Sequence, residues 1–147
     1  MNKSKLERGQ SLVEFAISLV IILWLLAGAV EFGIALFQYI QLRDAAQEGA
    51  LYGSINPPAS AAANDPNRLA IIARVRNASS SPLNLNDTSA VTVTVTVTGN
   101  GCVNGTSAVT VTASYNHQVF MPFATLFMGN TIPLSASVTD TILNSSC

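Results

Sequence analysis

One stretch near the amino terminus limits what this chain can fold into more than any other. Residues 12–30 are 19 consecutive positions with a single charged residue, Glu14, close to their start. A helix needs about 20 apolar residues to cross the hydrocarbon core of a bilayer, and water-soluble domains rarely contain such a run. We therefore predict a membrane-spanning helix.

The residues before this run indicate its orientation. Lys3, Lys5 and Arg8 precede it, with Glu7 as the only acid among them. Such an excess of positive charge keeps the amino terminus in the cytoplasm, so the remainder of the chain is expected outside. The alternative is a cleaved signal peptide, but the apolar run is too long and lacks an Ala-x-Ala-like end. We therefore expect the segment to be retained as a single-pass anchor of the inner (cytoplasmic) membrane.

A glycine and a glutamate mark the start of the apolar run. Gly9 directly precedes it, Gln10 follows, and Glu14 and Phe15 lie five and six residues beyond the glycine. This pattern resembles the class III signal of type IV pilin-like proteins. The resemblance implies that a prepilin peptidase cuts between Gly9 and Gln10, and that Glu14 and Phe15 take part in subunit pairing.

Physical chemistry gives a reason for the glutamate. A carboxylate in apolar surroundings is costly and needs a partner. The α-amino group freed by cleavage of a neighbouring subunit would be such a partner. The alternative is that Glu14 lies at the membrane interface and only reaches toward water.

The similarity continues down the chain. After residues 31–37 comes the block Ala45-Ala46-Gln47-Glu48-Gly49-Ala50. From Arg8 to Tyr52 the chain resembles the TadE-like family of pseudopilins, which are accessory subunits of tight-adherence (Tad/Flp) pilus systems. The resemblance implies a structural role in pilus assembly, adhesion or secretion. Its partners would be the membrane, the prepilin peptidase, other pilin-like subunits and the pilus assembly machinery.

Composition argues against other classes of function. The net charge is −1 and charged residues make up only 10% of the chain, so nucleic acid is not an expected partner. His117 is the only histidine and belongs to no catalytic pattern, while Asp87 and Asp140 stand alone. With no phosphate-binding glycine motif either, we expect no enzyme, no metal, no cofactor and no small-molecule substrate.

The chain divides into four parts in this interpretation: a leader at 1–9, a transmembrane and extended amphipathic helix at 10–52, a linker at 53–64 and an external head at 65–147. Glu31 would lie near the outer membrane boundary and extend to water at little cost. Gly49 and Gly53 fit the fraying end of the long helix.

The head is expected to be small and of the α+β class. A short helix, capped by Asn64 or Asp65 and ending near Ala78, would pack on an antiparallel sheet of about three strands. The predicted strands are 91–98, where Val-Thr alternation is clearest, 108–115 and 132–142. The arginines of the short helix should face solvent: Arg68, Arg74 and Arg76.

Two features of the head leave alternatives open. The apolar residues of segment 120–128 either pack under the sheet, which we favour, or form an exposed patch that docks a partner or the membrane. Cys102 and Cys147 are both expected on the oxidising side, where an even count favours a disulfide. If the second and third strands are antiparallel neighbours, both cysteines lie at the same edge.

Two classes of function therefore remain. The first is a minor pilin-like subunit of a tight-adherence pilus. The second is a membrane-tethered extracytoplasmic binding or adhesin module with no role in a filament. The two differ in the leader, because only a pilin-like subunit should lose residues 1–9.

Overall fold

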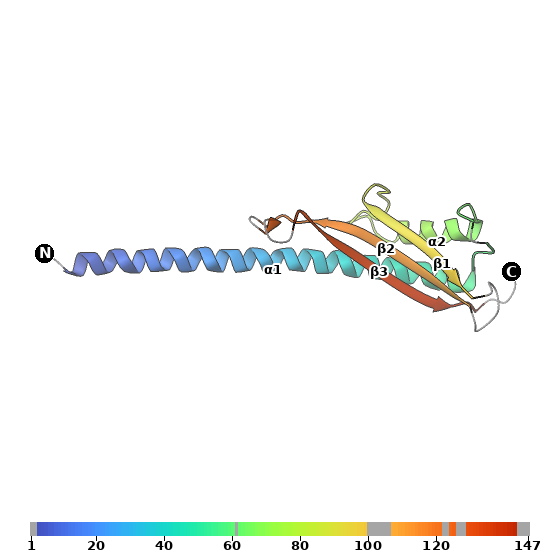
Figure 1. Ribbon diagram of the computed structural model, residues 1–147, viewed down its shortest axis with the longest axis horizontal. Coiled ribbons are helices and arrows are strands. Elements are labelled where there is room, and N and C mark those ends of the chain that lie inside the picture. Colours follow the sequence, from blue (N-terminus) through green and yellow to red (C-terminus); the bar gives the residue numbers. More distant parts are fainter. Residues whose placement is uncertain (1–2, 61, 100–106, 122–123, 126–128, 144–147) are drawn as a thin grey trace.

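The computed structural model describes residues 3–60, 62–99, 107–121, 124–125 and 129–143, with the backbone alone for 3–9. Its elements are α1 (Lys3–Ile55), α2 (Pro66–Asn77), β1 (Val91–Thr98), β2 (Ala108–Gln118) and β3 (Thr131–Thr141). Figure 1 shows α1 as one long rod whose first half projects alone, while its second half lies under the sheet and beside α2. The α+β fold with a long anchor helix and a small head is confirmed.

Helix α1 is one uninterrupted element with two different surroundings. Its 53 residues span about 80 Å at 1.5 Å per residue. The first half exposes its large apolar side chains, whereas the second half buries a narrow stripe of leucine and alanine. The stripe comprises Leu42, Ala45, Ala46 and Ala50. The helix ends at Ile55, three residues later than the predicted Tyr52.

The three strands form one antiparallel sheet in the order β1-β2-β3. Register pairs Val95 with Val111 across β1 and β2, and Val111 with Val138 across β2 and β3. Alternation then places the valines toward the helices and the threonines and serines toward the open side. The antiparallel pairing of the second and third strands is as expected, although β2 continues three residues beyond Tyr115.

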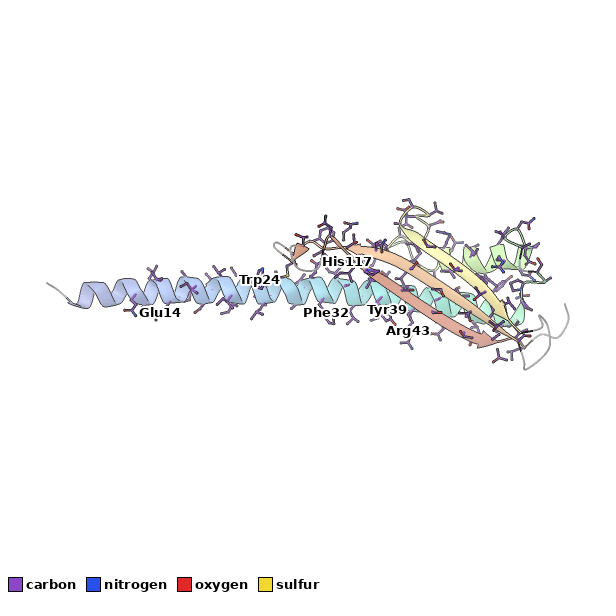
Figure 2. All side chains as sticks on the ribbon, viewed as in Figure 1. Glu14, Trp24, Phe32, Tyr39, Arg43 and His117 are labelled. Carbon is purple, nitrogen blue, oxygen red and sulfur yellow. The ribbon has the colours of Figure 1, made fainter. Side chains whose placement is uncertain are left out.

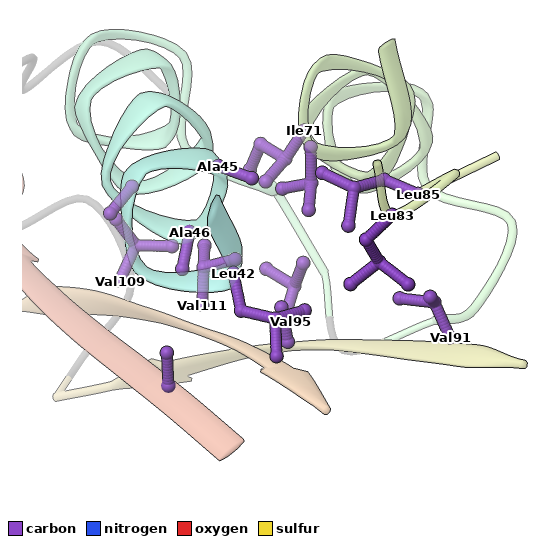
Figure 3. Packing of buried hydrophobic residues seen from close by; sticks show 14 residues of the cluster. Leu42, Ala45, Ala46, Ile71, Leu83, Leu85, Val91, Val95, Val109 and Val111 are labelled. Carbon is purple, nitrogen blue, oxygen red and sulfur yellow. The ribbon is translucent and has the colours of Figure 1, made fainter. Parts of the chain in front are cut away.

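The core lies between the sheet and the two helices, and α1 is the larger contributor. The second half of α1 covers β2 and β3, while α2 packs on α1 and on β1. Figure 3 shows Leu42 and Ala46 of α1 pointing at Val95 and Val111, with Ile71 of α2 to the side. The prediction of a single short helix on the sheet was therefore incomplete, because the anchor helix itself supplies most of the cover.

Two glycines of α1 make this close packing possible. A Cβ built on Gly49 would lie 2.5 Å from Val75 Cγ2, and one on Gly53 would lie 2.9 Å from Ile71 Cδ1. Both positions are buried, one turn apart, on the face that meets α2 and β2. Their interpretation as a fraying helix end was wrong, because they are the points of closest approach between α1 and its neighbours.

The amino terminus of α2 is capped as the sequence suggested. Asp65 Oδ1 accepts hydrogen bonds from the backbone N–H groups of Asn67 at 3.0 Å and Arg68 at 3.1 Å. Ser60 donates two further bonds, at 3.1 and 3.3 Å, to the other carboxylate oxygen. The hydrogen bond from the Arg68 N–H is the main reason that the pKa of Asp65 is held below its ordinary value.

The arginines of α2 depart from the expectation that all three face solvent. Arg68 donates to the carbonyl of Val95 on β1, and Arg76 donates to the carbonyl of Leu85 at 3.2 Å. Only Arg74 is exposed, where its guanidinium lies 3.7 Å from a Glu48 carboxylate oxygen. Because β1 is an edge strand, Arg68 occupies a carbonyl that would otherwise be open to another chain.

Candidate functional site

The leader motif lies at the exposed start of α1. The helix runs through Gly9 and Gln10 without a break, and Gln10 Nε2 donates to Glu14 Oε1 at 3.1 Å. Glu14 and Phe15 are exposed, and Figure 2 shows Glu14 on the part of α1 that lies far from the head. Cleavage after Gly9 and pairing through Glu14 and Phe15 stay predictions.

Helix α1 presents the length and surface that a bilayer requires. Between Gln10 and Ile55 it is long and apolar enough to cross a membrane, and the most apolar part of it is not buried in the protein. Side chains such as Leu12, Val20 and Leu25 are each at least 66% exposed. In water they would form a large apolar surface that nothing covers. The helix is therefore suited to anchor the chain in a membrane by a single pass.

A buried polar cluster joins this anchor to the head. His117 of β2 is fully buried, and its two ring nitrogens contact two residues of α1. Nε2 lies 2.7 Å from Glu31 Oε1, and Nδ1 lies 2.7 Å from Gln38 Oε1. Glu31 also accepts a hydrogen bond from the backbone N–H of Phe120, at 3.1 Å to Oε1 and 3.2 Å to Oε2.

Both nitrogens of the ring have a partner. Nε2 faces a carboxylate oxygen and Nδ1 faces the Gln38 amide, and the donor in each bond depends on the tautomer of the ring. Removing Glu31 or His117 would leave buried polar atoms of the other residue without this hydrogen bond, which is costly.

This cluster corrects one interpretation of the sequence. Glu31 does not extend to water, because only 8% of its surface is exposed and its carboxylate contacts His117 of the head. No role was assigned to His117 from the sequence, and the described residues of the cluster provide neither a nucleophile nor an open site for a substrate. Glu31 and Gln38 are seven residues apart, about two helical turns, so they lie on one face of α1. This spacing was the signal in the sequence that the two polar side chains share a partner.

The end of the sheet nearest the amino terminus lies against the anchor. Phe120 and Met121 line a shallow apolar hollow together with Leu26, Ala27 and Val30 of α1. Phe120 remains 73% exposed, so the favoured interpretation, that this segment packs under the sheet, is wrong for this residue. Most of the remaining segment to residue 128 lies outside the described residues.

The other predicted site residues have no described environment. Cys102 and Cys147 both lie outside the described residues, so their disulfide stays a prediction. Within the described ranges 10–60, 62–99, 107–121, 124–125 and 129–143, no group of three His, Cys, Asp or Glu side chains is placed to hold a metal ion.

Comparison with known families agrees with the geometry at the amino terminus. Residues 9–51 match the family described as TadE-like protein. The match begins at Gly9, includes Glu14, Glu31 and Gln38, and ends just before Tyr52. It confirms the TadE-like resemblance over the part of the chain that forms the anchor and its buried stripe, and it indicates a protein associated with Tad pili. A comparison with curated proteins gave no match, and a comparison with solved structures gave none either.

Proposed function

We propose that the protein is a minor pilin-like subunit, a pseudopilin, of a tight-adherence pilus, held in the inner membrane with its head outside. The observation that carries this is the TadE-like match over residues 9–51, which contains a glycine–glutamate pair at the start of an exposed apolar helix. The basic leader orients the anchor, since positive charge stays on the cytoplasmic side. Prepilin peptidase would cut between Gly9 and Gln10.

Assembly is the step in which Glu14 acts. Its side chain is exposed on a helix that is apolar all round, and among the described side chains it accepts a bond from Gln10 one turn away. Cleavage after Gly9 converts Gln10 into an α-amino terminus, a cation that a neighbouring subunit can present to this carboxylate. In a low-dielectric setting such a pairing is strongly favoured over two separate charges.

The intact mass of the protein extracted from membranes tests the proposal. We expect a chain that begins at Gln10, and a Gly9→Leu variant that keeps residues 1–9, because a side chain now occupies the position before the cut. A Gly33→Leu variant is the matched control and should be processed normally. A wild-type chain that still begins at Met1 or Asn2 would contradict the pseudopilin assignment.

A membrane-tethered binding module is the second candidate, and the open face of the sheet favours it. That face carries rows of hydroxyls on neighbouring strands and no charge, with Thr110 Oγ1 2.8 Å from Thr139 Oγ1 and Thr112 Oγ1 3.0 Å from Ser137 Oγ. Such a surface can hydrogen-bond a polar polymer such as a glycan. The same mass measurement separates the two candidates, since a tethered module keeps its leader.

We also propose the disulfide between Cys102 and Cys147. The sheet register supports it, because Ala108 at the start of β2 pairs with Thr141 at the end of β3. Beyond these, Ile142 N donates to the carbonyl of Ser107 at 2.9 Å, so the chain leaves both strands at one edge. Non-reducing peptide mapping tests the bond; two free thiols, or a dimer linked through Cys147, would contradict it.

A further inference from the structure

The outward surface of α1 stays apolar well beyond Glu31. From Phe32 to Ile40 every large exposed side chain is apolar or aromatic: Phe32, Ile34, Leu36, Phe37, Tyr39 and Ile40. The two polar side chains nearby, Glu31 and Gln38, are the two that His117 buries. Apart from the exposed Glu14 near its start, lipid would therefore meet an apolar surface from Leu12 to Ile40, about 43 Å along the helix against a hydrocarbon core of about 30 Å.

The end of the sheet nearest the amino terminus, the near end, lies beside part of this surface. Phe120 and Met121 line one hollow with Leu26, Ala27 and Val30 of the helix, which belong to the run that hydropathy assigns to the membrane. A Cβ built on Gly28 would lie 3.7 Å from the Met121 sulfur, an ordinary contact distance. Residues beside positions 26–30 lie at the same depth in the membrane as these positions. A bilayer that covers Val30 therefore also reaches Phe120.

An apolar groove continues this surface on the β3 side of the helix. It has a volume of about 480 Å³ and lies between α1, Met121 and the start of β3. Its lining includes Phe32, Ala35, Leu36, Tyr39, Met121 and Leu134. Because the groove is continuous with the membrane-spanning surface, lipid acyl chains are the occupant that its chemistry and position fit.

Backbone N–H groups at this end are hydrogen-bonded, as an apolar environment requires. The N–H of Phe120 donates to Glu31, and the N–H of Val119 donates to the carbonyl of Asn130 at 3.0 Å. Unsatisfied backbone groups are costly in hydrocarbon, so these bonds lower the cost of insertion.

We propose that the near end of the head, Phe120 and Met121 with the groove beside them, is inserted in the outer leaflet of the membrane. The Glu31–His117–Gln38 cluster then conceals, at that depth, the polar atoms that would otherwise face lipid. Burying a largely exposed phenyl ring also holds the head at a fixed tilt on its anchor. This inference rests on the single-pass anchoring proposed above.

Tryptophan fluorescence in vesicles containing lipids brominated along the acyl chain tests the proposal with the full chain. Trp24 is the only tryptophan and reports insertion of the helix in the wild-type protein. In a Trp24→Phe background, Phe120→Trp reports the near end of the head. Leu69→Trp in the same background is the matched control, since Leu69 is 52% exposed and belongs to α2, which Figure 1 shows toward the far end of the head.

We expect the brominated lipids to remove most of the emission at position 120, as at position 24, and to leave position 69 unquenched. If Trp24 is quenched but position 120 behaves like position 69, the inference is overturned and the anchor stands. If Trp24 itself is not quenched, the anchoring proposal fails. A blue-shifted but unquenched emission at position 120 would show a protein partner there, which also overturns the inference.

Discussion

The contact of Gly49 with α2 provides the sharpest test of how the anchor helix and the head are joined. A Gly49→Ala substitution places a methyl group 2.5 Å from Val75 Cγ2 and 3.4 Å from Val111 Cγ1. Val75 is fully buried, and a valine in a helix is held to one rotamer, so the methyl group cannot be accommodated by a simple rotation. Overpacking of this kind costs about 3 kcal/mol at the upper end of its usual range.

A second effect of this substitution has the opposite sign. Alanine is favoured over glycine inside a helix by about 1 kcal/mol. The clash is therefore expected to exceed the gain in helix propensity and to leave the head about 2 kcal/mol less stable. Because each 1.4 kcal/mol is a factor of ten, local opening of the head becomes about 30-fold more frequent.

Amide hydrogen exchange of the full chain in lipid nanodiscs measures this opening. We expect the amides of β2 and of the second half of α1 to exchange about 30-fold faster in Gly49→Ala than in the wild type. Gly33→Ala is the matched control, because nothing lies within 4 Å of a Cβ built there. Exchange in Gly49→Ala as slow as in Gly33→Ala would refute the close approach of α1 and α2.

Three further predictions concern single side chains. Glu14→Ala should insert in the membrane at least as well as the wild type but lose its pilin-like partners; co-purification at wild-type levels would rule out the pairing. His117→Ala removes a hydrogen-bond partner of the buried Glu31 carboxylate and should destabilise the head by about 1–3 kcal/mol, whereas Gln118→Ala, exposed on the same strand, should change little in a thermal melt. Asp65→Ala should lower the melting temperature at neutral pH, and the difference from wild type should vanish in acid. The pKa of Asp65 in the folded head lies below 3.8, its ordinary value. The contribution of Asp65 to stability is therefore complete above pH 3.8 and is lost as the pH falls through the lower pKa of the folded state. A difference in melting temperature that persists at lower pH would argue against the cap.

The regular elements and the anchor followed from the local pattern of residues. Alternation of valine and threonine was enough to place β1, because a strand's two faces differ at every second residue. Asp65 followed by Pro66 was enough to begin α2, since both residue types favour the first turn of a helix. The apolar run and its basic leader likewise indicated an anchor and its orientation without any tertiary information.

The limits of this reasoning are clearest at the junction of anchor and head. The sequence suggested that Glu31 reaches water, yet its partner His117 lies 86 residues away and is brought there only by the packing of β2 on α1. Nothing local distinguishes a glutamate that faces solvent from one that faces an imidazole. Phe120 was likewise assigned to the core because small domains need apolar residues inside, although α1 already supplies them.

The sequence by itself determined the anchor and the class of fold, because both depend on composition and periodicity within a few turns or one strand. The TadE-like start followed from a resemblance of residues 9–51 to a known family. Tertiary structure alone decided that the second half of the anchor is the main cover of the sheet. It also decided that Gly49 and Gly53 are contact points and that Glu31, Gln38 and His117 form one cluster. The physical reason is the same in each case: these roles depend on which surfaces are brought within a few ångströms of one another, and burial and hydrogen bonding between distant segments have no signature in the neighbouring residues.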